Sequence, residues 1–203
     1  MSSKKRYNLK DVNDMVELMR ISSEDARFCQ ELVQTNDSSI VRRLYVRAAV
    51  CYVESNVYAL KNSVIDMIDC GDFQALPGEM CLLLEESYHL NEKGNIRTRP
   101  SFVSLESNIR FVFDITSRAN NVEFVLDCSG LGWAAMKNAI EVRNRVTHPK
   151  SGSDFDISDT ELEYVATAYD WFGRQVVELL YLINIKLKQE NDAIKAQRSE
   201  AVA

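Results

Sequence analysis

The sequence contains little glycine and little proline, seven and three residues respectively out of 203. A β-sandwich or barrel needs turn residues about every 8–12 positions, so this scarcity argues against an all-β fold. It also excludes collagen-like and low-complexity classes. No apolar run approaches the roughly 18 uninterrupted residues of a membrane span. The opening stretch MSSKKRYNLKDVND is charged and lacks an apolar core, so we expect no secretory signal.

Metal-binding and disulfide patterns are also missing from the sequence. The two histidines, His89 and His148, belong to no cluster with the spacing of metal ligands. The five cysteines form no C-x-x-C pair, and an odd, scattered set is typical of reduced, mostly buried thiols. We therefore expect a cytoplasmic protein that needs no metal and no other cofactor.

The overall charge is acidic, with a formal net charge of −6 and an isoelectric point near 5.1. The chain as a whole is therefore no general nucleic-acid binder, although local basic groups remain candidates. Residues 151–170 hold six acidic side chains and no Lys or Arg, which suggests that the two signs of charge are segregated. Two basic groups could contact phosphates, or could simply be solvated surface: Arg42, Arg43 and Arg47, and then Lys93, Arg97 and Arg99.

Helical periodicity dominates the chain and predicts an all-α bundle with two long helices and several shorter ones. The long helix expected over 39–69 has an apolar stripe with alternating three- and four-residue spacing. A capping box at Ser158 to Glu161 opens the second long helix. From Lys186 onward its periodicity is lost, and we expect a fraying or disordered tail. We expect two shorter helices at 8–19 and 23–35, separated by a cap at Ser22 or Ser23. We expect further helices at 77–91, 102–118 and 131–147. The segment 91–100 is predicted to be a polar loop, and the segment 119–130 is ambiguous.

These elements suggest one domain in three parts. An N-terminal helical extension covers 1–37, the bundle covers 38–188, and a polar tail covers 189–203. We find no internal repeat of fixed period and no linker that would divide the bundle.

Two arginines on the helix at 131–147 differ in their expected surroundings. On a helical wheel at about 100° per residue, Arg143 falls inside the apolar arc and Arg145 on the polar side. Arg145 is therefore expected to be an ordinary surface charge. Arg143 points toward an interface or the core, where an unpaired guanidinium is costly. It either forms a buried ion pair with a carboxylate such as Glu54, or faces a cleft and binds an anion.

The residues that follow favour the second interpretation of Arg143. The segment Arg143-Asn144-Arg145-Val146-Thr147-His148 ends its helix just before Pro149. It resembles the R-x4-H signature of the HEPN superfamily, in the common form R-N-x3-H. In these helical bundles the motif lies near the end of one helix and is followed by a short loop and a long final helix, and residues 38–188 show the same order of elements.

The resemblance implies metal-independent RNA cleavage in a composite site formed by two chains, with Arg143, His148 and Asn144 as catalytic residues. Histidine is a natural acid or base near neutral pH, and a guanidinium offers a planar fork to phosphate oxygens. Glu54 and Asn62 are weaker candidates for supporting the Arg143 site. The implied partners are RNA, a second copy of the chain, and an antitoxin or other regulatory protein, in a toxin–antitoxin or phage-defence role.

Two features point the other way. Some HEPN toxins extend the motif to R-x4-H-x-Y with a modified tyrosine, but Lys150 stands at that position here. The acidity of the chain also disfavours RNA binding unless charge is segregated. The alternatives are a non-catalytic HEPN-like domain that binds RNA, a nucleotide or a protein, and an unrelated helical adaptor in which Arg143 forms a structural ion pair.

Overall fold

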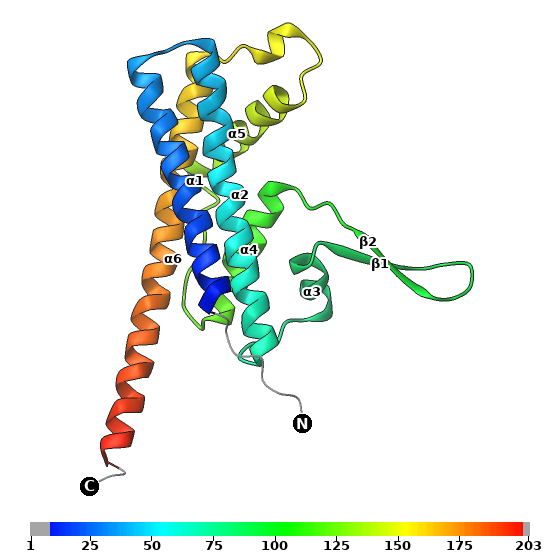
Figure 1. Cartoon of the computed structure of the whole chain (residues 1–203), viewed down its shortest axis with the longest axis vertical. Coiled ribbons are helices and arrows are strands. Elements are labelled where there is room, and N and C mark those ends of the chain that lie inside the picture. The colour runs from blue at the N-terminus through cyan, green and yellow to red at the C-terminus, as the bar shows by residue number, and fades with distance from the viewer. Residues whose placement is uncertain (1–8, 201–203) are drawn as a thin grey trace.

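The computed structural model describes residues 9–200 and shows an all-α helical bundle, as the sequence predicts (Figure 1). Helices α1 (Leu9–Thr35), α2 (Ser39–Cys70) and α6 (Asp159–Glu200) run along its length. The shorter helices are α3 (Pro77–Leu83), α4 (Leu105–Ala119) and α5 (Leu131–Thr147). Within the described residues, no helix has both the length and the hydrophobicity to cross a membrane.

Helix α2 is the centre of the bundle and packs against α1, α4, α5 and α6. It starts at Ser38, whose hydroxyl accepts a hydrogen bond from the Val41 N–H, and it ends at Gly71 with φ 80°. A left-handed residue at this point is the usual glycine helix stop. The predicted stripe is confirmed, since all its members are buried except Met67, which is partly buried: Val46, Val50, Val53, Val57, Leu60, Val64 and Met67.

The N-terminal extension is one helix, so the predicted break between 8–19 and 23–35 is wrong. Ser22 is buried in the middle of α1, and its hydroxyl donates to the Met19 carbonyl at 3.1 Å. A serine that bonds to the preceding turn needs no cap position, so it does not interrupt the helix. Of the predicted extension, residues 1–8 lie outside the described part of the chain.

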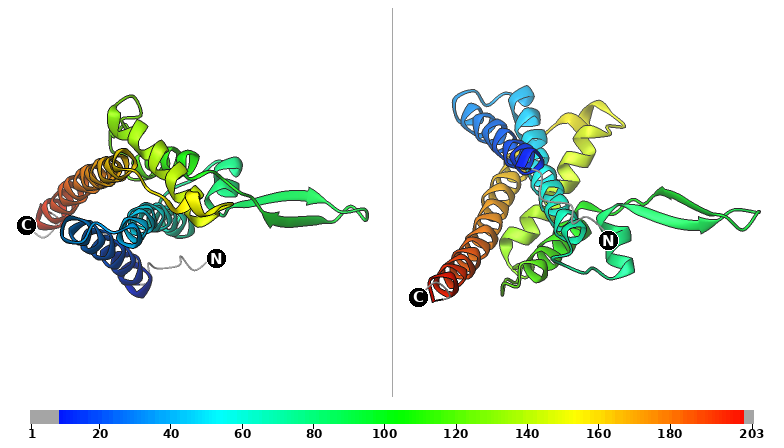
Figure 2. Two further views of the ribbon diagram at one scale, coloured as in Figure 1. Left: turned by 90° about the horizontal axis from the view of Figure 1, so that it is seen from above. Right: turned by 60° about the horizontal axis from the view of Figure 1, so that its bottom comes forward.

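A projecting β-hairpin replaces the end of the helix predicted at 77–91 and part of the loop predicted at 91–100. Helix α3 stops at Leu83, and Glu85 adopts a left-handed conformation with φ 52°. Strands β1 (Glu86–Leu90) and β2 (Ile96–Pro100) then pair in antiparallel register, with His89 opposite Arg97. The hairpin extends away from the body of the molecule (Figure 2). Cross-strand pairing overrides the weak helical pattern of this segment.

The remaining described residues form an irregular segment, α5, a short turn and α6. The ambiguous segment 119–130 is irregular, and Phe124 within it stacks on Phe113 of α4 at 5.6 Å between ring centroids. Helix α5 has the predicted bounds. A short 3₁₀ turn, η1 (Gly152–Phe155), lies in the loop before α6. Helix α6 continues to Glu200, so the predicted loss of structure from Lys186 is wrong for the described residues, and residues 201–203 fall outside them.

Candidate active-site cleft

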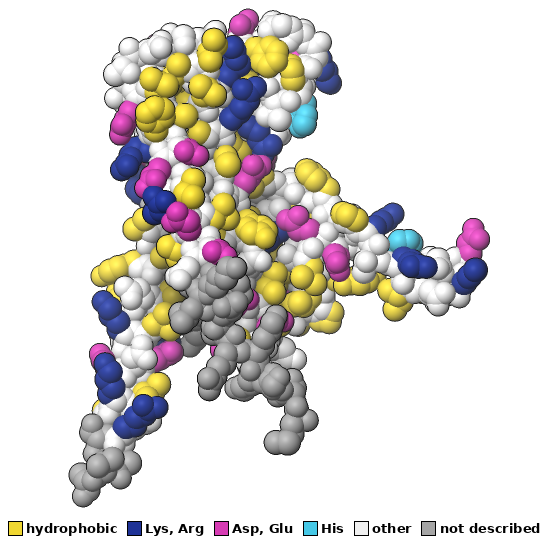
Figure 3. Space-filling view, viewed as in Figure 1, with side chains coloured by type: hydrophobic (Ala, Val, Ile, Leu, Met, Phe, Trp, Pro, Cys, Tyr) yellow, Lys and Arg dark blue, Asp and Glu magenta, His cyan; other side chains and the backbone are white. Residues whose placement is uncertain are grey.

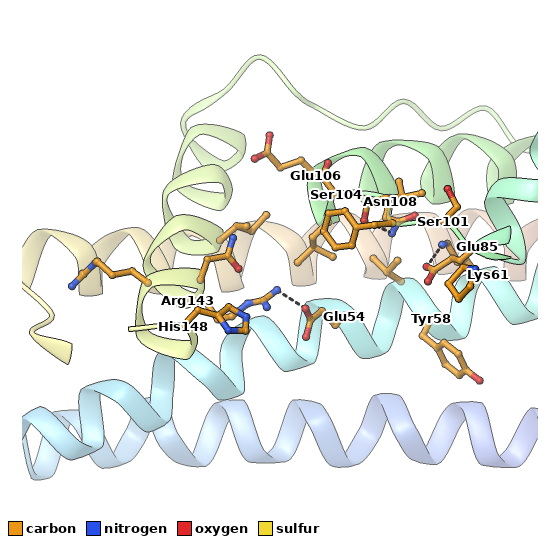
Figure 4. A pocket seen from close by; sticks show the side chains of 18 of the residues that line it. Glu54, Tyr58, Lys61, Glu85, Ser101, Ser104, Glu106, Asn108, Arg143 and His148 are labelled. Carbon is orange, nitrogen blue, oxygen red and sulfur yellow. Dashed lines mark hydrogen bonds and ion pairs between the residues drawn. The ribbon is translucent and has the colours of Figure 1, made fainter. Parts of the chain in front are cut away.

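An open cleft of about 1260 Å³ lies between α2, α5 and the start of α4, beside the segment that follows β2. Figure 4 shows its side chains converging from these elements. Three residues of the R-N-x3-H motif line it, namely Arg143, Asn144 and His148. The fold therefore brings the predicted catalytic residues to one solvent-reaching surface.

Arg143 lies partly buried in the cleft wall, with its side chain 20% exposed. Its Nη2 donates to Glu54 of α2, so the ion pair that the sequence analysis gave as the alternative to anion binding is present (Figure 4). Its Nε is buried and has no hydrogen-bond partner among the described residues. Because a charge removed from water needs compensation, the carboxylate of Glu54 offsets part of the cost of placing Arg143 here.

His148 caps the C-terminal end of α5 and is exposed. Its backbone N–H donates to the Asn144 carbonyl at 2.9 Å, so the last helical turn persists through the motif. Asn144 and His148 therefore lie on one face, as expected for residues four apart. Figure 4 labels His148 and Arg143 among the side chains that line the cleft.

Arg145 fastens the loop that follows the motif, which corrects the expectation of an ordinary surface charge. Its Nη1 donates to the carbonyls of Asp154 and Asp156 at 2.9 and 2.8 Å. Its Nη2 pairs with Glu161 at 2.6 Å. The helical wheel places Arg145 correctly on the polar side, but it does not show that the chain folds back over that side. The planar guanidinium holds the returning loop at three points.

The Arg145 clamp is reinforced by carboxylates that act as acceptors. Asp154 accepts hydrogen bonds from the backbone N–H groups of Lys150 and Ser151 at 2.6 and 3.0 Å. These two bonds lower the pKa of Asp154 below its usual range. Partial burial alone would raise the pKa of Glu161, but hydrogen bonds from Ser158 and Arg145 outweigh it and lower that pKa. Both groups therefore stay charged at neutral pH.

Arg42 and Arg43 of the first predicted basic group bond to the same loop. Arg42 pairs with Asp37 and with Asp159, at 2.5 and 2.7 Å. Arg43 donates to the Phe155 carbonyl and lies over the Phe155 ring, with 5.5 Å between its Cζ and the ring centroid. Arg47 is exposed and donates to the Val146 carbonyl at 3.3 Å. Basic side chains gather over this end of the bundle in Figure 3, but the structure gives each of these three a partner within the chain.

The second predicted basic group lies on the hairpin. Lys93 is in the turn, while Arg97 and Arg99 are on β2, and all three are exposed. Because alternate residues of a strand face opposite sides, Arg97 and Arg99 share one face with His89. The opposite face carries Tyr88, Leu90 and Ile96, which are also exposed. The hairpin therefore has one cationic face and one apolar face.

The far end of the cleft contains polar residues that the sequence analysis did not select. Lys61 is 4% exposed, and its Nζ pairs with Glu85 at 2.6 Å and lies 3.4 Å from the Leu82 carbonyl. The signal was present, because Lys61 interrupts the apolar face between Val57 and Val64. Buried Asn108 also lines the cleft, and its Oδ1 has no partner among the described residues.

The two supporting candidates have different surroundings. Glu54 lines the cleft and holds Arg143, as described. Asn62 is not among the residues that line the cleft, and its amide donates to the Tyr58 carbonyl at 2.8 Å. The amide of Asn62 therefore bonds to a backbone carbonyl of its own helix and does not support the Arg143 site.

The cleft combines a guanidinium, an exposed imidazole and an amide, which suits the binding of an anion that also needs a proton acceptor. Among the described residues, no group of three His, Cys, Asp or Glu side chains is placed to hold a metal ion. No family model, curated protein or solved structure matches the chain.

Proposed function

We propose that this protein is a metal-independent endoribonuclease of the HEPN type. The observation that carries the proposal is the placement of Arg143, Asn144 and His148 on the wall of one open cleft at the end of α5. A motif that occurred by chance would have no reason to lie with all three polar residues on an accessible, concave surface.

The proposed reaction uses the RNA itself as the nucleophile. A ribose 2′-hydroxyl attacks the adjacent phosphorus, the new P–O2′ bond forms, and the P–O5′ bond breaks. His148 accepts the proton of the 2′-hydroxyl, and a second imidazole or water protonates the leaving 5′-oxygen. Arg143 binds the non-bridging oxygens as negative charge develops on them. The products are a 2′,3′-cyclic phosphate and a 5′-hydroxyl.

A second copy of the chain would supply the missing acid. Each chain has one Arg143 and one His148, and the exposed position of His148 allows a two-fold partner to bring its own pair to the same phosphate. The cationic face of the hairpin extends the phosphate-binding surface beyond the cleft. We place this activity in the cytoplasm in a toxin–antitoxin or phage-defence role, with an antitoxin or other regulatory protein as the further partner.

The deciding experiment is RNA cleavage by the purified protein in EDTA, with identification of the product ends. We expect Arg143→Ala and His148→Ala each to lower the cleavage rate by about 100-fold or more. Arg174→Ala removes an exposed arginine from α6, outside the cleft, and is the matched control that retains full activity. Equal cleavage by all four proteins, or products with 3′-hydroxyl ends, would contradict the proposal.

The Arg143–Glu54 ion pair favours one second candidate, a non-catalytic domain that binds RNA, a nucleotide or a protein. The carboxylate competes with any phosphate for the guanidinium. In such a domain Glu54→Gln would raise the affinity for RNA because the competing charge is removed, while neither the wild type nor any variant would cleave. Measurement of RNA binding and RNA cleavage on the same set of variants separates the two functions.

A further inference from the structure

The C-terminal half of α6 projects beyond the rest of the molecule (Figures 1 and 2). Its first half packs into the core through Val165, Phe172 and Leu179, which are fully buried. From Leu187 to Arg198, in contrast, every side chain is exposed. Within the described residues, the apolar side chains of this extension therefore remain in contact with water.

A second apolar stripe runs along α6 and differs from the one that enters the core. Its members are exposed, between 40% and 67%, although each is a large apolar side chain: Val177, Leu180, Leu187 and Ile194. At 100° per residue this stripe lies roughly a quarter turn from the core-facing stripe. An unpaired row of aliphatic side chains over this length is a typical protein contact surface.

The spacing of the stripe is that of a coiled coil. Together with two asparagines its positions alternate by three and four residues, which is a seven-residue repeat: Val177, Leu180, Asn184, Leu187, Asn191 and Ile194. In this frame the a positions hold Val177, Asn184 and Asn191, and the d positions hold Leu180, Leu187 and Ile194. From Val177 to Ile194 the frame covers about two and a half heptads.

The residues at these positions specify two parallel strands. Val177 is the one β-branched residue at a, and with leucine at two d positions it favours dimers, while asparagine at a fixes register by pairing with the same residue of the partner helix at a cost in stability. In an antiparallel pair each asparagine would face a leucine or isoleucine, and its amide would lack a partner. The asparagines at 184 and 191 therefore favour the parallel, in-register arrangement.

Charges beside the seam agree with this orientation. Glu190 falls at a g position and Lys195 at the following e position, which face each other across a parallel dimer. Within the chain, Glu190 lies 3.6 Å from Lys186 and Lys195 lies 3.8 Å from Asp192, in exposed pairs that leave both side chains accessible. Two identical helices thus present opposite charges to each other.

We infer that two copies of this chain associate through a parallel coiled coil formed by residues 177–194 of α6. The core-facing side of α6 lies a quarter turn from the seam, so two-fold symmetry places the two bundles on opposite sides of the helix pair. The seam is separate from the cleft, which is lined by α2, α4, α5 and their neighbouring loops. The inference therefore does not depend on the proposed ribonuclease activity.

Cysteine cross-linking of the full chain tests both contact and direction. In a parallel dimer the two copies of residue 194 face each other, so Ile194→Cys should form a covalent dimer under mild oxidation. Gln189→Cys, on the outer f position, and the wild type with its own five thiols are the controls and should stay uncrosslinked. Cross-linking only in a mixture of Ile194→Cys and Val177→Cys, which an antiparallel pair would bring together, would overturn the parallel register.

Analytical ultracentrifugation measures the association without new thiols. We expect the wild type to dimerise at micromolar concentration, and Leu187→Asp to raise the dissociation constant at least about 10-fold. Gln189→Asp introduces the same charge on the outer face and should leave the constant unchanged. Leu187 is outside the buried core, so both variants should keep the wild-type thermal unfolding of the bundle. A wild type that remains monomeric at 100-fold higher concentration would overturn the inference.

Discussion

Two groups of basic residues that are alike in sequence have opposite surroundings in the fold. Arg42, Arg43 and Arg47, near the start of α2, donate to carbonyls and carboxylates of the same chain. On the hairpin, Lys93 and Arg97 are exposed, and the Arg99 side chain donates to the Ser87 hydroxyl of the neighbouring strand. Arg42 and Arg43 of the first group fasten the loop that follows α5 and Arg47 bonds to α5 itself, whereas the second group remains available to a ligand.

The difference follows from what lies near each group. The start of α2 faces the returning chain before α6, where carbonyls at element ends lack helical partners and acidic residues cap the next helix. Asp159 and Glu161 pair with Arg42 and Arg145, so the acidic stretch 151–170 is partly neutralised by arginines. The sequence suggested segregated charge, but at this end of the bundle the two signs are in contact.

The largest expected change in stability is at Arg145, which holds the same loop as Arg42 and Arg43 of the first group. Arg145→Ala leaves the carbonyls of Asp154 and Asp156 without their donor and Glu161 without its cation, so we expect the free energy of unfolding to fall by about 2–3 kcal/mol. Chemical denaturation measures this loss. Arg145→Lys should fall between the wild type and Arg145→Ala, because an ammonium lacks the planar fork. An unchanged midpoint for Arg145→Ala would show that the clamp contributes nothing.

A smaller and different effect is expected at the hairpin. Replacing Lys93, Arg97 and Arg99 by alanine should change stability by no more than about 0.5 kcal/mol per site, because these are exposed side chains. If they contact RNA phosphates, affinity should fall and the slope of log affinity against log salt should decrease by about 2, at roughly 0.7 per contact. Binding titrations at several salt concentrations give this slope.

Lys137→Ala combined with Arg174→Ala removes two exposed cations elsewhere on the bundle and serves as the control. It should leave the slope almost unchanged. A loss of slope in the control of about two thirds of that in the hairpin variant, in proportion to two cations removed instead of three, would mean that RNA responds to net charge rather than to the hairpin.

Much of the helical framework follows from local pattern. The stripe of α2, the bounds of α5 and the capping box before α6 all depend on residues within a few turns of one another. The elements that sequence analysis missed depend on distant partners. The strands at 86–90 and 96–100 form because they pair with each other, and a hydroxyl such as that of Ser22 can cap a helix or continue one.

In the candidate site too, features set by nearby residues could be predicted from the sequence, and contacts between distant residues could not. The wheel position of Arg143 correctly predicted a partly buried guanidinium, and Glu54 was correctly named as its partner. No periodicity could place Glu85 opposite Lys61, because that contact needs the left-handed turn between α3 and β1. Similarly, the role of Arg145 depends on a loop that returns over α5 from nine residues farther along the chain.

The smallest expected effect is a pH dependence to which the carboxylates near the Arg145 loop contribute. The pKa values of Asp37, Asp154 and Glu161 are lower in the fold than their ordinary values of 3.8 for aspartate and 4.5 for glutamate. The folded chain therefore binds fewer protons than the unfolded chain over this range. The stability from these groups is complete above about pH 5 and is lost as pH falls through the lowered pKa values. The loss should be small, because these carboxylates are partly exposed and screened by water.

Denaturation midpoints measured from pH 7 to pH 3 test this expectation and return to the comparison of the two basic groups. Arg145→Ala should show a shallower fall than the wild type, because Glu161 then loses one of the donors that lower its pKa. The hairpin variant should show the full wild-type fall, because its three cations pair with none of these carboxylates. Parallel curves for all three proteins would mean that acid destabilisation arises elsewhere in the bundle and that Arg145 acts on the loop through its carbonyl hydrogen bonds alone.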